Sequence, residues 1–273
     1  MIGVLKIGGG AGIDAAPALE NVAERVRSGE RWVIVHGASA AADALAARAG
    51  VPVETLVGAD GHTSRYTPPA MIDLYCAAAA SVNQTLVSAL AECGAQPVGL
   101  AGPNVIAARR KSAIRARRNG RPVVVRDDQT GTITGVEADL IERLVDAGYT
   151  PVVAPVALSE QYERLNVDGD LVAATLAAQL NAETLLILSN VPGLLRDLDD
   201  PRSLIGAIPQ HALDAHAALA QGRMKKKLLA ARIAHTAHII LATADRARPV
   251  DDALSGGGTH ILPEEVAHAA HAG

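Results

Sequence analysis

The sequence predicts an α/β protein with a mainly parallel central sheet and helices on both of its faces. Along the chain, short runs rich in Val, Ile and Leu alternate with longer helical patterns, which is typical of strands joined by crossover helices. Aromatic residues make up only 2% of the chain and Phe is absent, so Ala-rich helices and aliphatic strands must fill the core. The 273 residues are enough for one continuous domain of this kind.

The first elements are a strand, a Gly-rich loop, a helix and a second strand that ends in glycine. Two helical patterns and a third strand follow. In this part the predicted strands are 2–7, 32–36 and 97–100, and the predicted helices are 15–27, 40–49 and 70–93.

Segment 105–135 differs from the rest of the chain. It consists of short β-rich pieces broken by Asn119-Gly120 and Gly131, which predicts hairpins that project from the sheet. The parallel pattern then resumes, with predicted helices 137–147, 169–180 and 223–235 and predicted strands 150–154, 184–189 and 238–241. Since no internal repeat or long linker interrupts the chain, we expect residues 1–273 to form a single domain.

Composition narrows the possible functions. A hydrophobic fraction of 49% with 20% charged residues excludes disorder as the main state. The scarcity of aromatics disfavours a stacking surface for nucleic acid. The chain opens without a signal-peptide pattern, and polar residues interrupt its apolar stretches, so we expect a cytoplasmic protein with no membrane partner. Cys76 and Cys93 read as small buried hydrophobes in a reducing compartment.

Lys6 ends the first strand and is followed closely by Gly8, Gly9 and Gly10. Glycines let backbone N–H groups approach an anion, and a lysine beside them adds positive charge for phosphate. The pattern matches neither the Walker A sequence nor the G-x-G-x-x-G fingerprint. On this evidence alone, a phosphate loop and a plain tight turn are equally good interpretations.

Three other segments indicate ligand contact. The sequence V-H-G-A-S at 35–39 joins a strand to a helix, and it should face the same crevice as the first Gly loop. The sequence N-V-D-G-D at 166–170 holds more polar groups than one helix cap needs. The run G-R-M-K-K-K at 222–227 places cations at a helix N-terminus, where an anion should offset them. Lys227 lies nearest the apolar face of that helix, whereas Lys225 and Lys226 can be read as a solvated turn.

With these motifs the chain resembles the amino acid kinase family, and within it the acetylglutamate kinase branch. The resemblance extends from Lys6 to about Leu262. It depends on the shared order of motifs that are weak individually: K-x-G-G at 6–9, V-H-G at 35–37, Ser64-Arg65, Asn166 with Asp170, L-S-N-V-P-G at 188–193, G-x-M-x-x-K at 222–227 and Gly258-Thr259.

The resemblance implies a three-layer αβα sandwich, with the substrate in half 1–155 and ATP in half 156–273. It also implies ATP with Mg²⁺ as cofactor, no metal site of the protein's own, and a homodimer. By matched position, the catalytic residues would be Lys6, Lys227 and Asp170, the substrate-binding residues Gly37, Ala38, Arg65 and Asn166, and the nucleotide-binding residues Gly8, Gly9, Ser189, Asn190 and Gly193.

In this family Lys6 and Lys227 would stabilise the transferring phosphoryl group, and Asp170 would hold both lysines. A carboxylate acceptor is already ionised at pH 7, so no general base is required. The family turn usually reads His-Gly-Gly, and here Ala38 replaces the second glycine. If that position needs a positive φ, the alanine would cost about 1 kcal/mol of strain.

Segment 109–126 contains eight cations and no acidic residue, whereas the whole chain carries a net charge of −4. Alone, such a run reads as a solvated face. The chain also resembles the family branch that phosphorylates 2-aminoadipate, or glutamate, linked through its amino group to the small carrier protein LysW. A basic hairpin would then grip the acidic tail of the carrier, through Arg109, Arg110, Lys111, Arg115, Arg117 and Arg118. The product would be an acyl phosphate of lysine biosynthesis, or of both lysine and arginine biosynthesis.

Two other functions stay open. An N-acetylglutamate kinase of arginine biosynthesis would need no basic hairpin. A catalytically silent amino-acid sensor would not need the phosphoryl-stabilising lysines that this chain retains. The sequence does not distinguish glutamate from aminoadipate, because one methylene changes binding by only about 1–3 kcal/mol.

Overall fold

The centre of the molecule is an eight-stranded sheet with the strand order β14-β16-β15-β13-β1-β2-β10-β5. The computed structural model describes residues 2–58, 61, 63–217, 219–220, 222–236 and 238–263. Neighbouring strands of this sheet are parallel, except for the antiparallel pair β15 and β16. The strand bounds are β1 Ile2–Ile7, β2 Arg31–His36, β5 Pro97–Leu100, β10 Thr150–Val153, β13 Thr184–Ser189, β14 Ala207–Pro209, β15 His238–Thr243 and β16 Thr259–Leu262.

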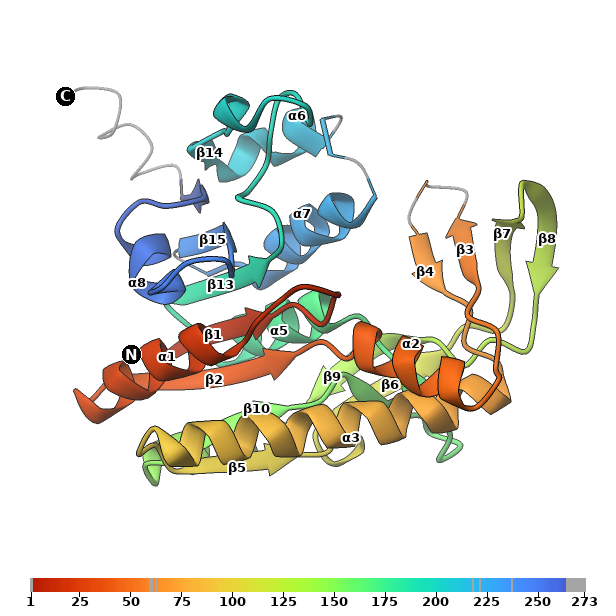
Figure 1. The fold of residues 1–273 in the computed structure, drawn as a ribbon, viewed down its shortest axis with the longest axis horizontal. Coiled ribbons are helices and arrows are strands. Elements are labelled where there is room, and N and C mark those ends of the chain that lie inside the picture. Colours follow the sequence, from red (N-terminus) through yellow and green to blue (C-terminus); the bar gives the residue numbers. More distant parts are fainter. Residues whose placement is uncertain are drawn as a thin grey trace.

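Helices cover both faces of the sheet, which confirms the predicted three-layer αβα fold (Figure 1). Leu19 of α1 and Leu90 of α3 pack in the core on one face, together with α8. Ile141 of α4 and Leu176 of α5 pack in the core on the other face, together with α7. The helix bounds are α1 Ala16–Arg27, α2 Ser39–Arg48, α3 Pro69–Glu92, α4 Ala138–Asp146, α5 Gly169–Gln179, α6 Leu213–Ala217, α7 Arg223–Ala234 and α8 Pro249–Leu254, with short 3-10 turns at Gly102–Asn104, Pro201–Ser203 and Gln210–Ala212.

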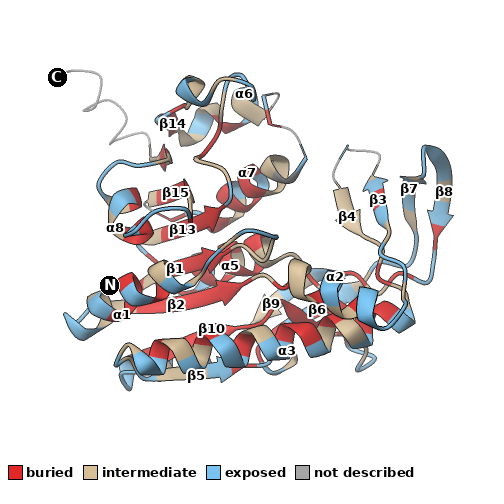
Figure 2. Cartoon of the chain, viewed as in Figure 1, coloured by how far each residue is buried: buried red, intermediate tan, exposed pale blue. Residues whose placement is uncertain are grey.

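Strand alternation decides which side chains face which helices. Trp32 and Ile34 of β2 belong to the core beneath α1 and α3, whereas Val33 and Val35 belong to the core beneath α5 and α7. Burial on both faces explains why these strands are apolar almost throughout, and Figure 2 shows β1, β2 and β13 as mostly buried. A polar side chain near the end of such a strand is therefore directed to one face.

The predicted hairpins of segment 105–135 contribute to two smaller sheets. One has the order β12-β11-β6-β9 and the other β4-β3-β7-β8. The β7–β8 turn is Asn119-Gly120, whose φ angles of 51° and 77° are typical of a two-residue hairpin turn. The second sheet projects from the body at the right of Figure 1. The bounds are β3 Thr55–Gly58, β4 Thr63–Arg65, β6 Ile106–Arg110, β7 Ile114–Arg118, β8 Arg121–Val125, β9 Gly131–Val136, β11 Val156–Leu158 and β12 Arg164–Asn166.

Within the described part of the chain, one helix, α3, is long and apolar enough to cross a membrane when judged by length and composition alone. It packs over β5 and β10 on one face of the central sheet, and Leu86 and Leu90 lie in the core. A core-facing position accounts for the apolar composition of that side of the helix. Residues 264–273, which the predicted second half includes, lie outside the described residues.

Candidate active site

Three charged side chains meet at the carboxyl ends of the central strands. The Nζ of Lys6 lies 2.7 Å from Oδ1 of Asp170, and the Nζ of Lys227 lies 3.0 Å from Oδ2 of the same carboxylate. None of the three side chains is more than 9% exposed. The structure thus brings together the three residues predicted to be catalytic, with Asp170 between the two lysines.

Each of these side chains comes from a different element. Lys6 is the last residue but one of β1. Asp170 lies in the first turn of α5, where a carboxylate interacts favourably with the helix dipole, and Asp168 caps that helix by accepting hydrogen bonds from the N–H groups of Asp170 and Leu171. Lys227 enters from α7, which packs against α5.

The charge balance of this group favours an incoming anion. Burial alone would raise the pKa of Asp170, but the ammonium groups of Lys6 and Lys227 outweigh burial and hold that pKa well below its ordinary value. Burial lowers the pKa of Lys227, Asp170 opposes that shift, and Lys6 adds to it. Because Asp170 is ionised at neutral pH and faces two lysines, the group carries surplus positive charge toward the cleft.

A second ion pair lies beside the first. The Nζ of Lys226 is 3.0 Å from Oδ2 of Asp168, so Asp168 both caps α5 and pairs with α7. The interpretation of Lys226 as part of a solvated turn is therefore wrong. Asp168 and Asp170 together supply the anions that the basic start of α7 requires.

The two predicted Gly loops touch each other across the crevice. A side chain on Gly9 would collide with the backbone of Gly37 and Ala38, and a side chain on Gly37 would collide with the backbone of Gly9. The loops are also hydrogen-bonded, since the Gly9 carbonyl accepts from the Ser39 hydroxyl and the Ala40 N–H, both at 2.7 Å. Both glycines are therefore required by close backbone approach.

Ala38 occupies the position where the family usually has a second glycine, and its backbone is not strained. Its φ is −135° and its ψ is 15°, and it serves as the N-cap residue of α2. Since φ is negative, the expected cost of a positive-φ alanine does not arise here.

Arg65 and Asn166, predicted to bind substrate, also border the crevice. Arg65 lies 2.5 Å from Asp43 and donates to the Ser39 carbonyl at 3.0 Å. Asn166 donates from Nδ2 to Thr67 Oγ1 at 3.0 Å. These contacts fix Arg65 beside the start of α2 and Asn166 beside Thr67, two residues before α3.

The predicted site residues line one cleft with a volume of about 820 Å³, within the range of small-molecule sites. Gly61, between β3 and β4, lies beside the Nζ of Lys225 of α7. The lining includes every predicted catalytic, substrate-binding and nucleotide-binding residue: Lys6, Gly8, Gly9, Gly37, Ala38, Arg65, Asn166, Asp170, Ser189, Asn190, Gly193 and Lys227.

The cationic run of segment 109–126 divides into two groups. Arg118 pairs with Glu54 and lies over the Tyr66 ring at 4.8 Å, and Arg110 pairs with Glu163 at 3.1 Å. Each of these arginines is therefore paired next to another strand of its own small sheet. The exposed group is Arg109, Lys111, Arg115, Arg117, Arg121 and Arg126, of which Lys111 also lines the cleft.

Sequence reasoning missed two residues of the site, Asp43 and Tyr75, and gave no role to a third, Thr259. Asp43 of α2 is an ion-pair partner of Arg65, and no local pattern marks it. Tyr75 of α3 is buried in the cleft wall, and burial raises its pKa above the ordinary value. Thr259 accepts a hydrogen bond from Leu194 N–H at 2.8 Å and packs on Gly193, so the Gly258-Thr259 motif supports the 188–193 loop.

Comparison with known proteins adds independent findings. The profile of the amino acid kinase family matches residues 1–240. A LysW-aminoadipate kinase from Deinococcus radiodurans is 40% identical over 267 residues, covering 94% of this chain and 90% of that protein. A LysW-aminoadipate kinase from Thermus thermophilus is 38% identical, covering 94% and 99%.

Other similar proteins extend this pattern. An acetylglutamate kinase from Sorangium cellulosum is 35% identical over 234 residues, covering 82% of this chain and 79% of that protein. Among solved structures, N-acetylglutamate synthase from Neisseria gonorrhoeae superposes with a TM-score of 0.80 at 22% identity, covering 96% of this chain and 59% of that one. At that identity the likeness concerns the fold alone.

Proposed function

The chain belongs to the amino acid kinase family, and on that premise we propose that it transfers a phosphoryl group from ATP to the side-chain carboxylate of 2-aminoadipate linked to the carrier protein LysW. The observation that carries the proposal is the buried group in which Asp170 bridges Lys6 and Lys227 at the carboxyl ends of the parallel strands. The 38–40% identity to two LysW-aminoadipate kinases supports the choice of substrate.

The proposed chemistry needs charge neutralisation rather than a base. A carboxylate nucleophile is ionised at pH 7, so the main task is to align two anions and to stabilise charge on the transferring phosphoryl oxygens. In our proposal Lys6 and Lys227 supply that stabilisation, while Asp170 keeps their ammonium groups in place. Removal of one such donor typically lowers turnover by about 10²- to 10³-fold.

Substrate and nucleotide would enter from opposite sides of this charged group. In our proposal the amino-acid substrate occupies half 1–155, with Gly37 and Ala38 contacting it through backbone, Arg65 pairing with its α-carboxylate, and Asn166 assisting from the edge of the other half. ATP would occupy half 156–273, against the loop that contains Ser189, Asn190 and Gly193, and would also contact Gly8 and Gly9 of the first half. The cleft is continuous between the two groups, which supports this arrangement.

Magnesium would accompany the nucleotide. Asp170 is engaged by two lysines, and Asp168 is engaged by Lys226 and the α5 N-terminus. Among the described residues no group of three or more potential ligands is arranged to hold a metal. The site therefore fits Mg²⁺ held chiefly by ATP phosphates, where it would neutralise phosphate charge.

We propose that the exposed cations of the projecting sheet receive the acidic carrier. Strand pairing aligns Arg117 with Val57, and Thr55 with Arg65, so these side chains lie on one face of the sheet. Arg115 lies on the same face, two residues before Arg117. That face runs from an exposed cationic surface to Arg65 at the cleft, which suits a substrate whose amino group is tethered to an acidic protein.

The relative from Sorangium cellulosum favours a second candidate, N-acetylglutamate kinase. The same Lys6, Asp170 and Lys227 chemistry would serve that reaction. The exposed arginines of β7 would then have no role in substrate binding.

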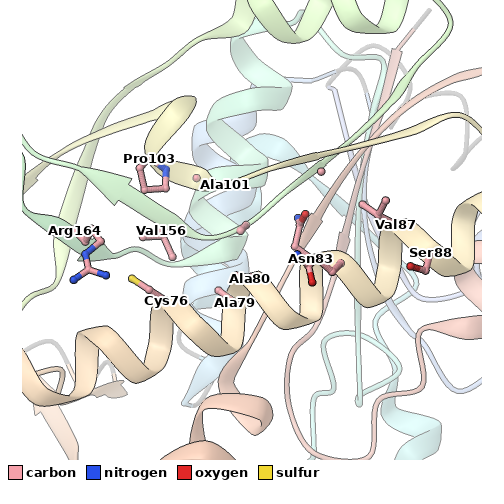
Figure 3. A pocket seen from close by; sticks show the side chains of 14 residues that line it. Cys76, Ala79, Ala80, Asn83, Val87, Ser88, Ala101, Pro103, Val156 and Arg164 are labelled. Atoms are coloured by element: carbon pink, nitrogen blue, oxygen red, sulfur yellow. The ribbon is translucent and has the colours of Figure 1, made fainter.

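We also propose that the protein is a homodimer in the cytoplasm, with no nucleic-acid or membrane partner. The β5 edge of the central sheet and the adjoining side of α3 form a groove of about 610 Å³, lined mostly by small and apolar residues such as Ala80 and Val87, with Asn83 and Arg164 among its polar ones (Figure 3). This surface would suit a second copy of the chain. Cys76 and Cys93 are free and lie too far apart along α3 for a mutual disulfide, which fits a reducing compartment.

The reaction can be tested by measuring ATP consumption with Mg²⁺ and carrier-linked aminoadipate, using Lys227→Met as the matched control. We expect consumption that depends on the loaded carrier and falls at least about 10²-fold in the variant. Equal consumption by both proteins would contradict the proposed role of Lys227.

A further inference from the structure

His36 is a buried histidine that the phosphoryl chemistry does not use. It is the last residue of β2 and only 1% exposed. Its Nδ1 lies 3.2 Å from the carbonyl oxygen of Gly37, and its Nε2 lies 3.2 Å from Nδ2 of Asn83. Both ring nitrogens therefore have partners, and one of them is the backbone of the second Gly loop.

The contacts of Asn83 define the tautomer of His36. Asn83 projects from the side of α3 that faces the strands (Figure 3). Its Nδ2 lies 2.8 Å from the Val152 carbonyl oxygen, which can only accept, so this atom is the amide nitrogen. The same nitrogen donates to Nε2 of His36, and Nε2 must accept. The proton of the neutral ring is therefore on Nδ1, which donates to Gly37.

The His36 ring stays neutral at neutral pH. Burial lowers its pKa to about 4, and the nearby Lys6 contributes in the same direction, although the Gly37 carbonyl opposes it. Among the described residues, Lys6 is the one charged group that shifts this pKa. The Nδ1–H tautomer therefore persists at neutral pH.

This contact orients the next peptide. In a trans peptide the C=O and N–H point in opposite directions, so a Gly37 carbonyl turned toward His36 directs the Ala38 N–H away from it. His36 follows Trp32 and Ile34 on the α1 and α3 side of β2, whereas Lys6 follows Val4 on the opposite side of β1. The Ala38 N–H is thus turned toward the side of the sheet where Lys6 meets Asp170.

The Ala38 N–H needs an acceptor. Ala38 is 2% exposed and lines the cleft, and within the described part of the chain its N–H has no hydrogen-bond acceptor. Buried N–H groups without a partner are costly, so an anionic ligand oxygen is the partner that this geometry suits. A rotated peptide would present a carbonyl to that anion instead.

We propose that His36 and Asn83 are positioning residues that hold the Gly37–Ala38 peptide with its N–H directed at the substrate. The inference rests on the proposed function for the identity of that substrate. Asn83 fixes the tautomer of His36, and His36 donates to the Gly37 carbonyl. The Gly37–Ala38 peptide also packs against Gly9, which restricts its movement. A residue of α3 thereby controls the orientation of a peptide in the active site. Otherwise α3 contributes Tyr75 to the cleft wall and no charged group to the phosphoryl site.

The kinetic test uses a pair of substitutions at His36. His36→Asn places an amide nitrogen where Nδ1 stood, whereas His36→Gln places one nearer to Nε2. We expect His36→Asn to keep turnover within about tenfold of the wild type, and His36→Gln to lose about 10²-fold, with the KM for ATP unchanged in both. Equal losses in the two variants would overturn the positioning role.

A second substitution tests the same assignment from α3. In Asn83→Asp a carboxylate would accept from Nε2–H, so the ring can keep its Nδ1 donor only as imidazolium. We expect turnover of this variant to fall as pH rises from 6 to 8.5. Wild-type turnover should not fall over the same range. A pH profile parallel to that of the wild type would contradict the inference. His238→Asn, at a half-buried histidine far along the sheet on β15, is the control for histidine loss.

A spectroscopic measurement separates this inference from the proposed reaction. In protein labelled with ¹⁵N-histidine, the His36 ring should show a protonated Nδ1 and an unprotonated Nε2 between pH 5.5 and 8, identified by signals lost in His36→Asn. Asn83→Leu should shift those signals. The Nε2–H tautomer, or no change in Asn83→Leu, would refute the positioning role even if the kinase activity is confirmed. The expected tautomer with no turnover on carrier-linked aminoadipate would leave this hydrogen-bond chain in place and overturn the proposed reaction alone.

Discussion

The Nζ of Lys6 lies 2.7 Å from Oδ1 of Asp170, a contact that joins the end of β1 to the first turn of α5. The other carboxylate oxygen is held by Lys227, so a single buried anion orients two cations. Buried charges are tolerated when they are paired, and here the pairing also leaves positive charge facing the cleft.

Asp170→Asn should reduce both activity and stability. The substitution leaves two buried ammonium groups without an anion, and breaking a buried pair typically costs about 3–5 kcal/mol. We expect turnover to fall by at least about 10²-fold and the urea midpoint of unfolding to drop. Asp200→Asn is the control, because its pair with Arg202 is exposed and should have a small effect. Similar unfolding midpoints for the two variants would contradict the structural role of Asp170.

Gly9→Ala should abolish turnover because the new Cβ would meet the Gly37 and Ala38 backbone. Something in the two loops must then shift, and the N–H groups aimed at the cleft would move with it. Gly206→Ala is a matched control, since no atom lies within 4 Å of a Cβ built there. Steady-state turnover and melting temperature of both variants check this prediction, which fails if Gly9→Ala retains wild-type turnover.

Charge reversal at Arg115 and Arg117 should weaken recognition of the loaded carrier. Both are exposed on the face of the projecting sheet that also carries Arg65. We expect a KM for carrier-linked substrate raised at least about tenfold and less sensitive to salt, with an unchanged KM for ATP. Arg202→Glu, at an exposed arginine in the other half, should leave both constants unchanged. A free N-acetylglutamate kinase would show no effect of either change.

The free energy of unfolding should fall as pH is lowered from 6.5 toward 4. Burial lowers the pKa of His36 to about 4, so the unfolded chain binds a proton in this window while the folded chain does not. His36 does not reduce the free energy of unfolding above pH 6.5, whereas by pH 4 its resistance to protonation lowers that free energy by roughly 3 kcal/mol. Urea titrations of the wild type and His36→Asn should show a shallower pH dependence for the variant. Identical slopes would show that His36 does not resist protonation in the fold.

Much of the fold follows from local pattern. The central strands are apolar because both faces are buried, and this pattern predicted β1, β2, β5, β10, β13 and β15 to within about two residues. The Asn119-Gly120 turn was likewise predicted from residue types. Short strands such as β3, β4, β11 and β16 were not predicted, because three or four residues carry too little periodicity unless, as at β5 and β10, a predicted helix leads directly into them.

The site divides in the same way. The order of motifs predicted which residues line the cleft, including Lys6, Asp170 and Lys227. The ion-pair partners of the cations in segment 109–126 could not be predicted. In the sequence Arg110 and Arg118 resemble the other cations of this segment, and only the fold brings Glu163 and Glu54 beside them. The backbone of Ala38 likewise became clear only in three dimensions.

The most direct test of the account is the trapping of acyl phosphate by hydroxylamine, with ATP and Mg²⁺, on three substrates: carrier-linked aminoadipate, carrier-linked glutamate and free N-acetylglutamate. The account predicts hydroxamate on the carrier-linked substrates, most on aminoadipate, and little or none on free N-acetylglutamate. Hydroxamate from free N-acetylglutamate alone would contradict it, and would make the cationic face of the projecting sheet a solvated surface.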